Sequence, residues 1–126
     1  PSALEGLDAD LGYAGTPFIA THESRAAAEH KASVVTTAAD GVTQSSLVTG
    51  IPANFARESL VREGVIAPDG TLLHEGALDV ASWKTVWSMG HGCGGVSAVR
   101  PAAEVIAGLV ADWRAARQMA RSRPAQ

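Results

Sequence analysis

The sequence has little cysteine and no long apolar run, and each shortage excludes a class of protein. Cys93 is the only cysteine, so no disulfide can form within the chain, which favours a reducing compartment and predicts a cytoplasmic location. No stretch of about 18 apolar residues is present, so we expect no membrane-spanning helix. The N-terminal residues lack a basic segment followed by an apolar core, so no signal peptide is visible.

Charge is also in short supply. The 126 residues carry a net charge of −3, which implies no general attraction to nucleic acid or to anionic lipid. Residues 100–126 hold five arginines against Glu104 and Asp112, a net charge of +3, so the rest of the chain carries −6. This pattern is typical of a solvated helix face with a basic tail. A hydrophobic content of 46% with 18% charged residues indicates one globular domain.

Local composition predicts helices alternating with few strands. An alanine-rich stretch behind Ser24 and a stretch between Asn54 and Gly64 have the caps and stops of helices. Residues 67–77 are polar and irregular, as in a surface loop. The expected elements are a strand at 11–14 ending in a tight Gly15-Thr16-Pro17 turn, a helix at 24–38, an extended segment at 41–50, helices at 54–64 and 79–89, and a long helix from Pro101.

These elements do not make a complete fold. The order of strands and helices is that of an α/β chain, but one firm strand cannot form a parallel sheet. The last helix also carries an apolar stripe that needs a partner surface, formed by Val105, Ile106, Leu109, Val110 and Trp113 and extended by Ala102 and Ala116. The chain therefore reads as part of a fold.

Most kinds of chemical site lack the residues they need. The four histidines are His22, His30, His74 and His91, and no second Cys/His pair stands at zinc-finger spacing, so no metal site is expected. His91 precedes Cys93 by two residues, but a small buried cysteine is favoured over a nucleophile. His22 and His30 are expected in a loop and on a helix surface. No Gly-x-Ser-x-Gly elbow is present.

Two glycine turns are better candidates, as a cradle for a cofactor. "YAGTPF" (13–18) follows the expected strand, and "SMGHGCGG" (88–95) follows an expected helix. Backbone N–H groups without a neighbouring Cβ can approach a phosphate or a planar ring closely. Neither turn matches the Gly-x-Gly-x-x-Gly or Walker patterns, so each alone is a weak signal.

Three segments in order resemble the FMN-dependent nitronate monooxygenases, also called 2-nitropropane dioxygenase-like proteins. "ALEGLDADLGYAGTPFIATHES" (3–24) is similar to the family stretch Met-Gly-Thr-Arg-Phe-(Leu/Ile)-Ala-Thr-x-Glu-Ser and the residues before it. "SSLVTGIPANFARES" (45–59) resembles the next family segment loosely. "WKTVWSMGHGCGGVSAVRPAAEVIAGLVADW" (83–113) is similar to the family's Trp-x-Ala-Gly-Gln-Gly-x-Gly stretch and terminal helix.

The resemblance implies that residues 1–126 are the C-terminal part of one FMN-binding TIM (β/α)8 barrel. Residues 3–20 would contain the end of helix 7, strand 8 and a phosphate turn. Residues 21–82 would form a helical and extended excursion, and residues 83–123 a flavin-side glycine loop and the terminal helix. The terminal stripe would then dock on barrel elements that lie outside this chain.

The resemblance also implies site residues. Ala14, Gly15 and Thr16 match the family's Met-Gly-Thr, whose backbone N–H groups face the FMN phosphate. Met89, Gly90 and His91 match its Ala-Gly-Gln, near the flavin and the substrate. Two residues depart from the family pattern. Pro17 replaces an arginine, which removes a charge and a donor. His91 replaces a glutamine, and histidine is a residue type that can titrate near neutrality, whereas glutamine is always neutral.

Three functions follow as hypotheses. The first is flavin-mediated oxidation of alkyl nitronates, and the second is an NAD(P)H-using, FMN-dependent reductase of enoyl thioesters or quinones in the same superfamily. The third is a non-catalytic fragment or split subunit that binds a partner polypeptide. The expected partners are a small-molecule substrate and the remainder of the barrel, in the same or a separate chain, with a homo-oligomer left open. The family's catalytic histidine lies upstream in a Gly-Gly-His stretch, so the catalytic base stays unknown and His91 is a substrate-side candidate.

Overall fold

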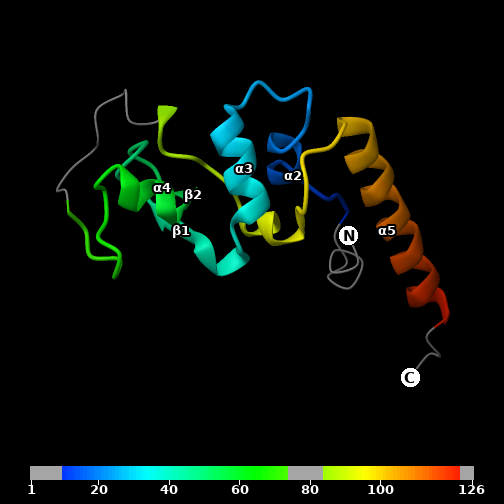
Figure 1. Cartoon of the computed structure of the whole chain (residues 1–126). Helices are drawn as coiled ribbons and strands as arrows, with labels where there is room; N and C mark the ends of the chain where they lie inside the picture. The colour runs from blue at the N-terminus through cyan, green and yellow to red at the C-terminus, as the bar shows by residue number, and fades with distance from the viewer. Residues whose placement is uncertain (1–9, 74–83, 123–126) are drawn as a thin grey trace.

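A computed structural model describes residues 10–73 and 84–122 (Figure 1). Short helices and a small hairpin make up the body, and one long helix follows. In chain order the elements are α2 (Thr16–Ile19), α3 (Ala28–Thr36), the 3-10 turn η1 (Ala39–Gly41), β1 (Val42–Ser45), β2 (Ala53–Ala56), α4 (Arg57–Arg62), the 3-10 turn η3 (His91–Gly95) and α5 (Ala102–Ser122).

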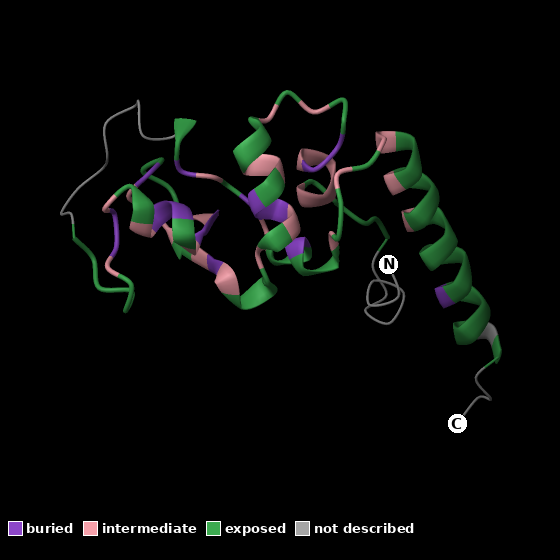
Figure 2. Ribbon diagram, viewed as in Figure 1, coloured by how far each residue is buried: buried purple, intermediate pink, exposed green. Residues whose placement is uncertain are grey.

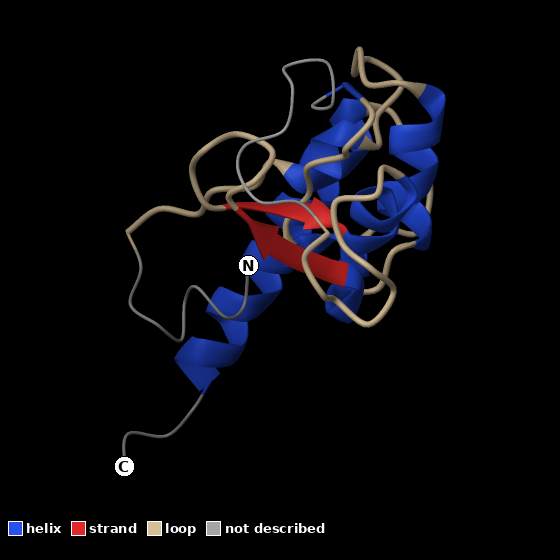
Figure 3. Ribbon diagram, turned by 90° about the vertical axis from the view of Figure 1, so that its left-hand side faces the viewer, coloured by secondary structure: helices blue, strands red, loops and turns tan. Residues whose placement is uncertain are grey.

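The hairpin is antiparallel, with Val42 opposite Ala56 and Ser45 opposite Ala53 (Figure 3). A third segment lies against its second strand, because Phe55 and Ser88 form an isolated antiparallel bridge. The expected helix at 54–64 was therefore wrong at its start. Residues 54–56 give their backbone groups to neighbouring strands, and the helix begins only at Arg57. Its predicted stop is confirmed, since Gly64 has φ +67, a conformation that glycine adopts without a Cβ clash.

Two small cores hold the body together (Figure 2). One joins α2, α3, β1 and η3 and contains the buried residues Ala20, Val34, Val42, Ala56, Met89 and Cys93. The other lies around β2 and α4 and contains Val48, Phe55, Leu60, Val65, Ile66 and Val86. The segment 86–93 passes from the second core to the first, so it joins the two halves of the body.

The strand expected at 11–14 is not formed. These residues pair with no other segment that the structure describes, and the Leu11 and Tyr13 side chains are 88% and 100% exposed. A strand needs a hydrogen-bonded neighbour, and none of the other described segments pairs with residues 11–14. The tight turn expected at Gly15-Thr16-Pro17 is instead the start of α2, with Gly15 as N-cap and proline in the first turn.

Two expected helices differ from the structure. The first is shorter than 24–38, because α3 runs from Ala28 to Thr36 and Ser24 does not cap it. The Ser24 hydroxyl oxygen instead accepts a hydrogen bond from the Ala26 amide. The helix expected at 79–89 is absent from its described part: residues 86–89 pair with β2 as an extended segment. Residues 79–83 of that prediction, with Trp83, lie outside the described residues, and so does His74.

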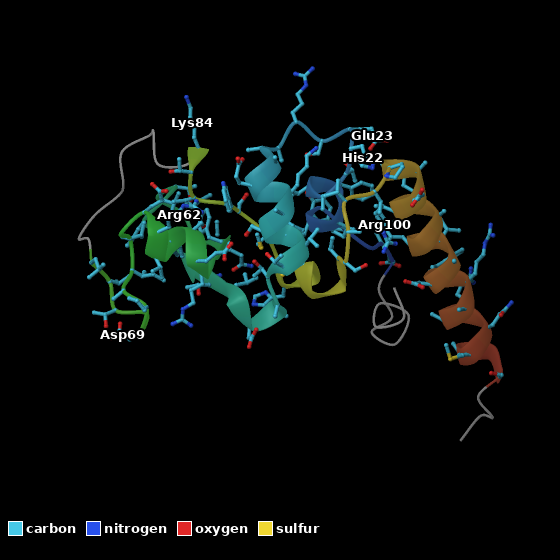
Figure 4. The ribbon with its side chains drawn as sticks, in the orientation of Figure 1. His22, Glu23, Arg62, Asp69, Lys84 and Arg100 are labelled. Atoms are coloured by element: carbon cyan, nitrogen blue, oxygen red, sulfur yellow. The ribbon has the colours of Figure 1, made fainter. Side chains whose placement is uncertain are left out.

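The long C-terminal helix is confirmed. Its first turn is held by a side chain from the other end of the chain, because the Ala102 amide donates to Glu23 Oε2 at 2.9 Å. Residues 20–22 also pair in parallel with Arg100, with the His22 amide donating to the Arg100 carbonyl at 3.0 Å (Figure 4). The apolar stripe remains in contact with solvent: Ile106 is 52% exposed and Trp113 is 43% exposed. None of the described helices has the length and apolarity to cross a membrane.

Candidate functional site

The structure brings the two glycine turns into contact. The Gly90 amide donates a hydrogen bond to Thr16 Oγ1 at 2.8 Å, joining residues that are 74 positions apart. A Cβ added at Gly90 would lie 3.3 Å from the same oxygen, a tighter approach than a side chain readily accepts. Glycine at position 90 therefore allows the close contact between the two turns.

An open groove of about 760 Å³ lies where the turns meet. Its walls come from the segment around α2, from the second strand of the hairpin and from the glycine loop. The lining residues are Tyr13, Ala14, Gly15, Thr16, Pro17, Ile19, Ala53, Asn54, Ser88, Met89, Gly90 and Gly92. A smaller cavity of about 200 Å³ lies against α5 and contains none of the predicted site residues.

The groove offers a ligand only neutral groups, because none of its lining residues carries a formal charge. The backbone N–H groups of Ala14, Gly15 and Thr16 have no acceptor in the described part of the chain. The Thr16 oxygen accepts from Gly90, which leaves its own hydroxyl hydrogen for a ligand. Amide and hydroxyl donors gathered in this way suit an anionic oxygen such as that of a phosphate.

Five of the six predicted binding residues line this groove, and His91 does not. His91 is exposed and begins η3. Met89 contributes differently from the others, since its side chain is 3% exposed and belongs to a core. Its amide donates to the Asn54 carbonyl at 3.1 Å, so Met89 anchors the wall of the groove.

Cys93 is a small buried side chain of the core, as predicted. It is 1% exposed, and its Sγ lies 3.8 Å from the Ala38 carbonyl oxygen and 4.0 Å from that of His91, within the first core. Among the residues that the structure describes, no group of acidic, histidine or cysteine side chains stands ready to hold a metal ion.

Sequence reasoning missed two residues beside the groove. Asn54 was interpreted as a helix cap and is instead part of the groove wall. His30 was interpreted as a surface histidine, but it is half-buried, and its Nε2 lies 2.9 Å from the Ser88 carbonyl oxygen. This contact spans 58 positions, and no local pattern encodes it.

Burial lowers the pKa of the His30 imidazole from its ordinary value of 6.5, and the hydrogen bond to Ser88 opposes that shift. The neutral ring is therefore favoured in the folded protein. Its Nε2 carries the hydrogen, because a carbonyl oxygen can only accept. His30 thus donates to the segment that forms one wall of the groove.

Comparisons with known proteins show the fold. No family model matches the chain, and no curated protein matches it. Among solved structures, the chain is similar to part of a TIM-barrel protein. That protein is a point mutant of FabK from Thermotoga maritima, with a TM-score of 0.66, 18% sequence identity and 95% of this chain covered. The matched region spans 39% of the FabK chain, which agrees with the expected partial barrel.

Proposed function

We propose that these residues form the C-terminal part of an FMN-dependent oxidoreductase, and that the groove is one side of its FMN site. The observation that carries the proposal is the contact between Thr16 and Gly90. It joins the two turns that the sequence resemblance assigned independently to the phosphate and to the flavin ring. The likeness to FabK supports it, because FabK is an FMN-dependent enoyl-ACP reductase with a TIM barrel.

The residues of the groove fit FMN by their chemistry. The free N–H groups of Ala14 and Gly15 and the Thr16 hydroxyl would bind phosphate oxygens. Gly90 and Gly92 present backbone without side chains, so a planar ring could approach the loop closely; nothing lies within 4 Å of a Cβ built at Gly92. When bound, FMN supplies the electron transfer, while the protein orients it and excludes water.

Pro17 lies in the groove wall where the family pattern has an arginine, so the phosphate would be held by dipoles without a nearby cation from this segment. The remaining charge compensation would come from the rest of the barrel. Because the match spans 39% of FabK, we propose that further barrel elements, in the same or a separate chain, complete the site. The exposed Leu11, Tyr13 and Trp113 side chains support a surface that such elements cover.

Two substrate classes are supported by different observations. The quoted segments resemble nitronate monooxygenases, which favours oxidation of alkyl nitronates. The solved structure is FabK, which favours reduction of an enoyl thioester by NAD(P)H. In either case His91 is proposed to face the substrate, where its imidazole could donate a proton or a hydrogen bond to an oxygen.

The first test is FMN titration of the protein with its full barrel and of residues 1–126 alone. We expect the full barrel to be yellow and to bind FMN stoichiometrically, and the 126 residues to bind it poorly. Thr16→Val should weaken FMN binding about 10- to 100-fold, the loss expected for one hydrogen bond to a charged group, and Thr16→Ser should restore it. A full barrel without FMN affinity would refute the proposal and favour a non-catalytic subunit.

The second test separates the substrate classes. The FMN-loaded protein is given either crotonyl-coenzyme A with NADH or NADPH, or a nitronate with oxygen. Turnover of the thioester assigns the reductase, and turnover of the nitronate assigns the monooxygenase. His91→Gln should change the pH profile or the substrate preference more than the FMN content. Loss of FMN with unchanged turnover of the flavin that remains would contradict the placement of His91.

A further inference from the structure

Hydrogen bonds to several other elements hold the backbone of residues 87–90, a segment that includes the groove wall at Ser88, Met89 and Gly90. Its backbone has little freedom, although only His91 and Cys93 carry side chains in the glycine-rich stretch 91–95 that follows it. Six backbone atoms of this segment are hydrogen-bonded: Trp87 N to Ser59 Oγ, Trp87 O to Ala56 N, Ser88 O to His30 Nε2, Met89 N to Asn54 O, Gly90 N to Thr16 Oγ1, and Gly90 O to Cys93 N. Four of these bonds come from β2, from Ser59 on α4 or from Thr16 on α2, and one comes from Cys93 within the glycine loop.

His30, on α3, contacts this segment in two ways. The ring nitrogen lies 2.9 Å from the Ser88 carbonyl oxygen. The imidazole also stacks on the Trp87 indole, with ring centroids 5.9 Å apart and planes 9° apart. The hydrogen bond to Ser88 and the ring stacked on Trp87 together restrain both the position and the orientation of the segment.

The same indole receives a cation from α4. The guanidinium carbon of Arg62 lies 4.1 Å from the Trp87 ring centroid, and Arg62 Nη2 donates to the Thr85 carbonyl at 2.6 Å. Trp87 is therefore contacted by side chains of both flanking helices. The helices α3 and α4 otherwise meet through the Ser33 hydroxyl, which donates to Glu58 Oε1 at 2.8 Å.

We propose that His30 is a positioning residue for the glycine loop: through Ser88 and Trp87 it holds residues 87–90 where Gly90 meets Thr16. The role in FMN binding rests on the function proposed above. The role in positioning the loop does not rest on that function, because it concerns only the contacts that hold the loop in place. His30 contacts the second glycine turn at its first residue, Ser88, and its effect on Gly90 passes through the backbone of Ser88.

The experiment separates the hydrogen bond from the stacking. His30→Phe keeps an aromatic ring for Trp87 and removes the donor, and His30→Gln keeps a donor and removes the ring. His22→Phe and His22→Gln are the matched controls, since His22 is exposed and its side chain makes no hydrogen bond among the described residues. Amide hydrogen exchange of residues 87–92 reads the loop, and exchange of α5 reads an element that His30 does not contact.

We expect His30→Phe to speed exchange at Met89 and Gly90 about two- to tenfold, with α5 unchanged, because one hydrogen bond of the loop is lost. His30→Gln should restore slow exchange at these amides. In the FMN-loaded protein, His30→Phe should weaken FMN binding by a similar factor and shift the visible flavin bands. Equal exchange in wild type, His30→Phe and the His22 variants would overturn the proposal.

The two proposals fail in distinguishable ways. If wild-type protein binds no FMN, the proposed function fails, while exchange at Met89 and Gly90 still decides the role of His30. If His30→Phe does not fold, the comparison is made between His30→Gln and His30→Leu, which removes both the ring and the donor. Slow exchange in the first and fast exchange in the second supports the proposal, because only glutamine can donate to the Ser88 carbonyl. The reverse order overturns it.

Discussion

The Ser59 side chain on α4 makes hydrogen bonds both to the hairpin and to the residue before the glycine loop. It is fully buried, its hydroxyl donates to the Ala56 carbonyl at 2.7 Å, and its oxygen accepts from the Trp87 amide at 3.0 Å. We predict that Ser59→Ala destabilises the fold, because it removes both bonds at once and leaves the Trp87 amide without an acceptor.

The magnitude follows from these two bonds. Each hydrogen bond contributes about 0.5–1.5 kcal/mol net, and an unsatisfied buried donor costs about 1–3 kcal/mol. The better helix propensity of alanine in α4 offsets about 0.5 kcal/mol. We therefore expect a loss of about 2 kcal/mol in the free energy of unfolding, from a total of about 5–15 kcal/mol for a domain.

Urea unfolding followed by far-UV circular dichroism measures this loss. With a slope of about 2 kcal/mol per molar urea, the midpoint should fall by about 1 M with an unchanged slope. Ser46→Ala is the control, since Ser46 is exposed and its hydroxyl makes no hydrogen bond among the described residues. A midpoint for Ser59→Ala that equals that of Ser46→Ala would refute the reasoning.

Two further predictions concern the ends of helices. The hydrogen bond from the Ala102 amide holds the pKa of the Glu23 carboxyl below its ordinary value of 4.5, and desolvation opposes this shift. The contact therefore stabilises the fold at pH values above 4.5, and this stabilisation is lost as the pH falls through the lowered pKa. The thermal midpoint of Glu23→Gln should therefore lie below that of wild type near neutrality and converge with it once the pH is below the lowered pKa of Glu23; a constant difference would contradict the cap. Gly64→Ala should lower stability by about 1 kcal/mol, because Gly64 has φ +67, whereas Gly92→Ala, at a glycine with open space and no positive φ, should leave urea stability nearly unchanged. Equal losses in the two glycine variants would show that backbone conformation at Gly64 is not the cause.

Local chemistry made several features predictable. The C-terminal helix is recognisable from Pro101 and an apolar stripe of period 3.6, and the stop of α4 from Gly64, because caps and periodicity act within one turn of helix. The burial of Cys93 among glycines was also within reach of composition. The shortage of strands indicated part of a fold, and the resemblance to the family implied that this part belongs to a barrel; the likeness to part of FabK agrees with a partial barrel.

Local sequence patterns gave wrong predictions where hydrogen bonds to distant backbone groups decide the secondary structure. Residues 11–14 have the composition of a strand but pair with no segment that the structure describes, so they do not form one. Residues 84–89 have helical spacing, yet their amides and carbonyls bond to β2, to Ser59 and to His30, which a helix would not allow. Asn54 looked like a cap and became part of β2 for the same reason.

The sequence by itself determined the terminal helix, the stop of α4 at Gly64 and the scarcity of charge, since these depend on residue type and near neighbours. Only the tertiary structure decided that Gly90 lies on Thr16 and that His30 reaches Ser88, because these contacts join residues 74 and 58 positions apart. Distance along the chain carries no information about such contacts. They form only when the hairpin and three helices are packed together, and the groove exists only where they meet.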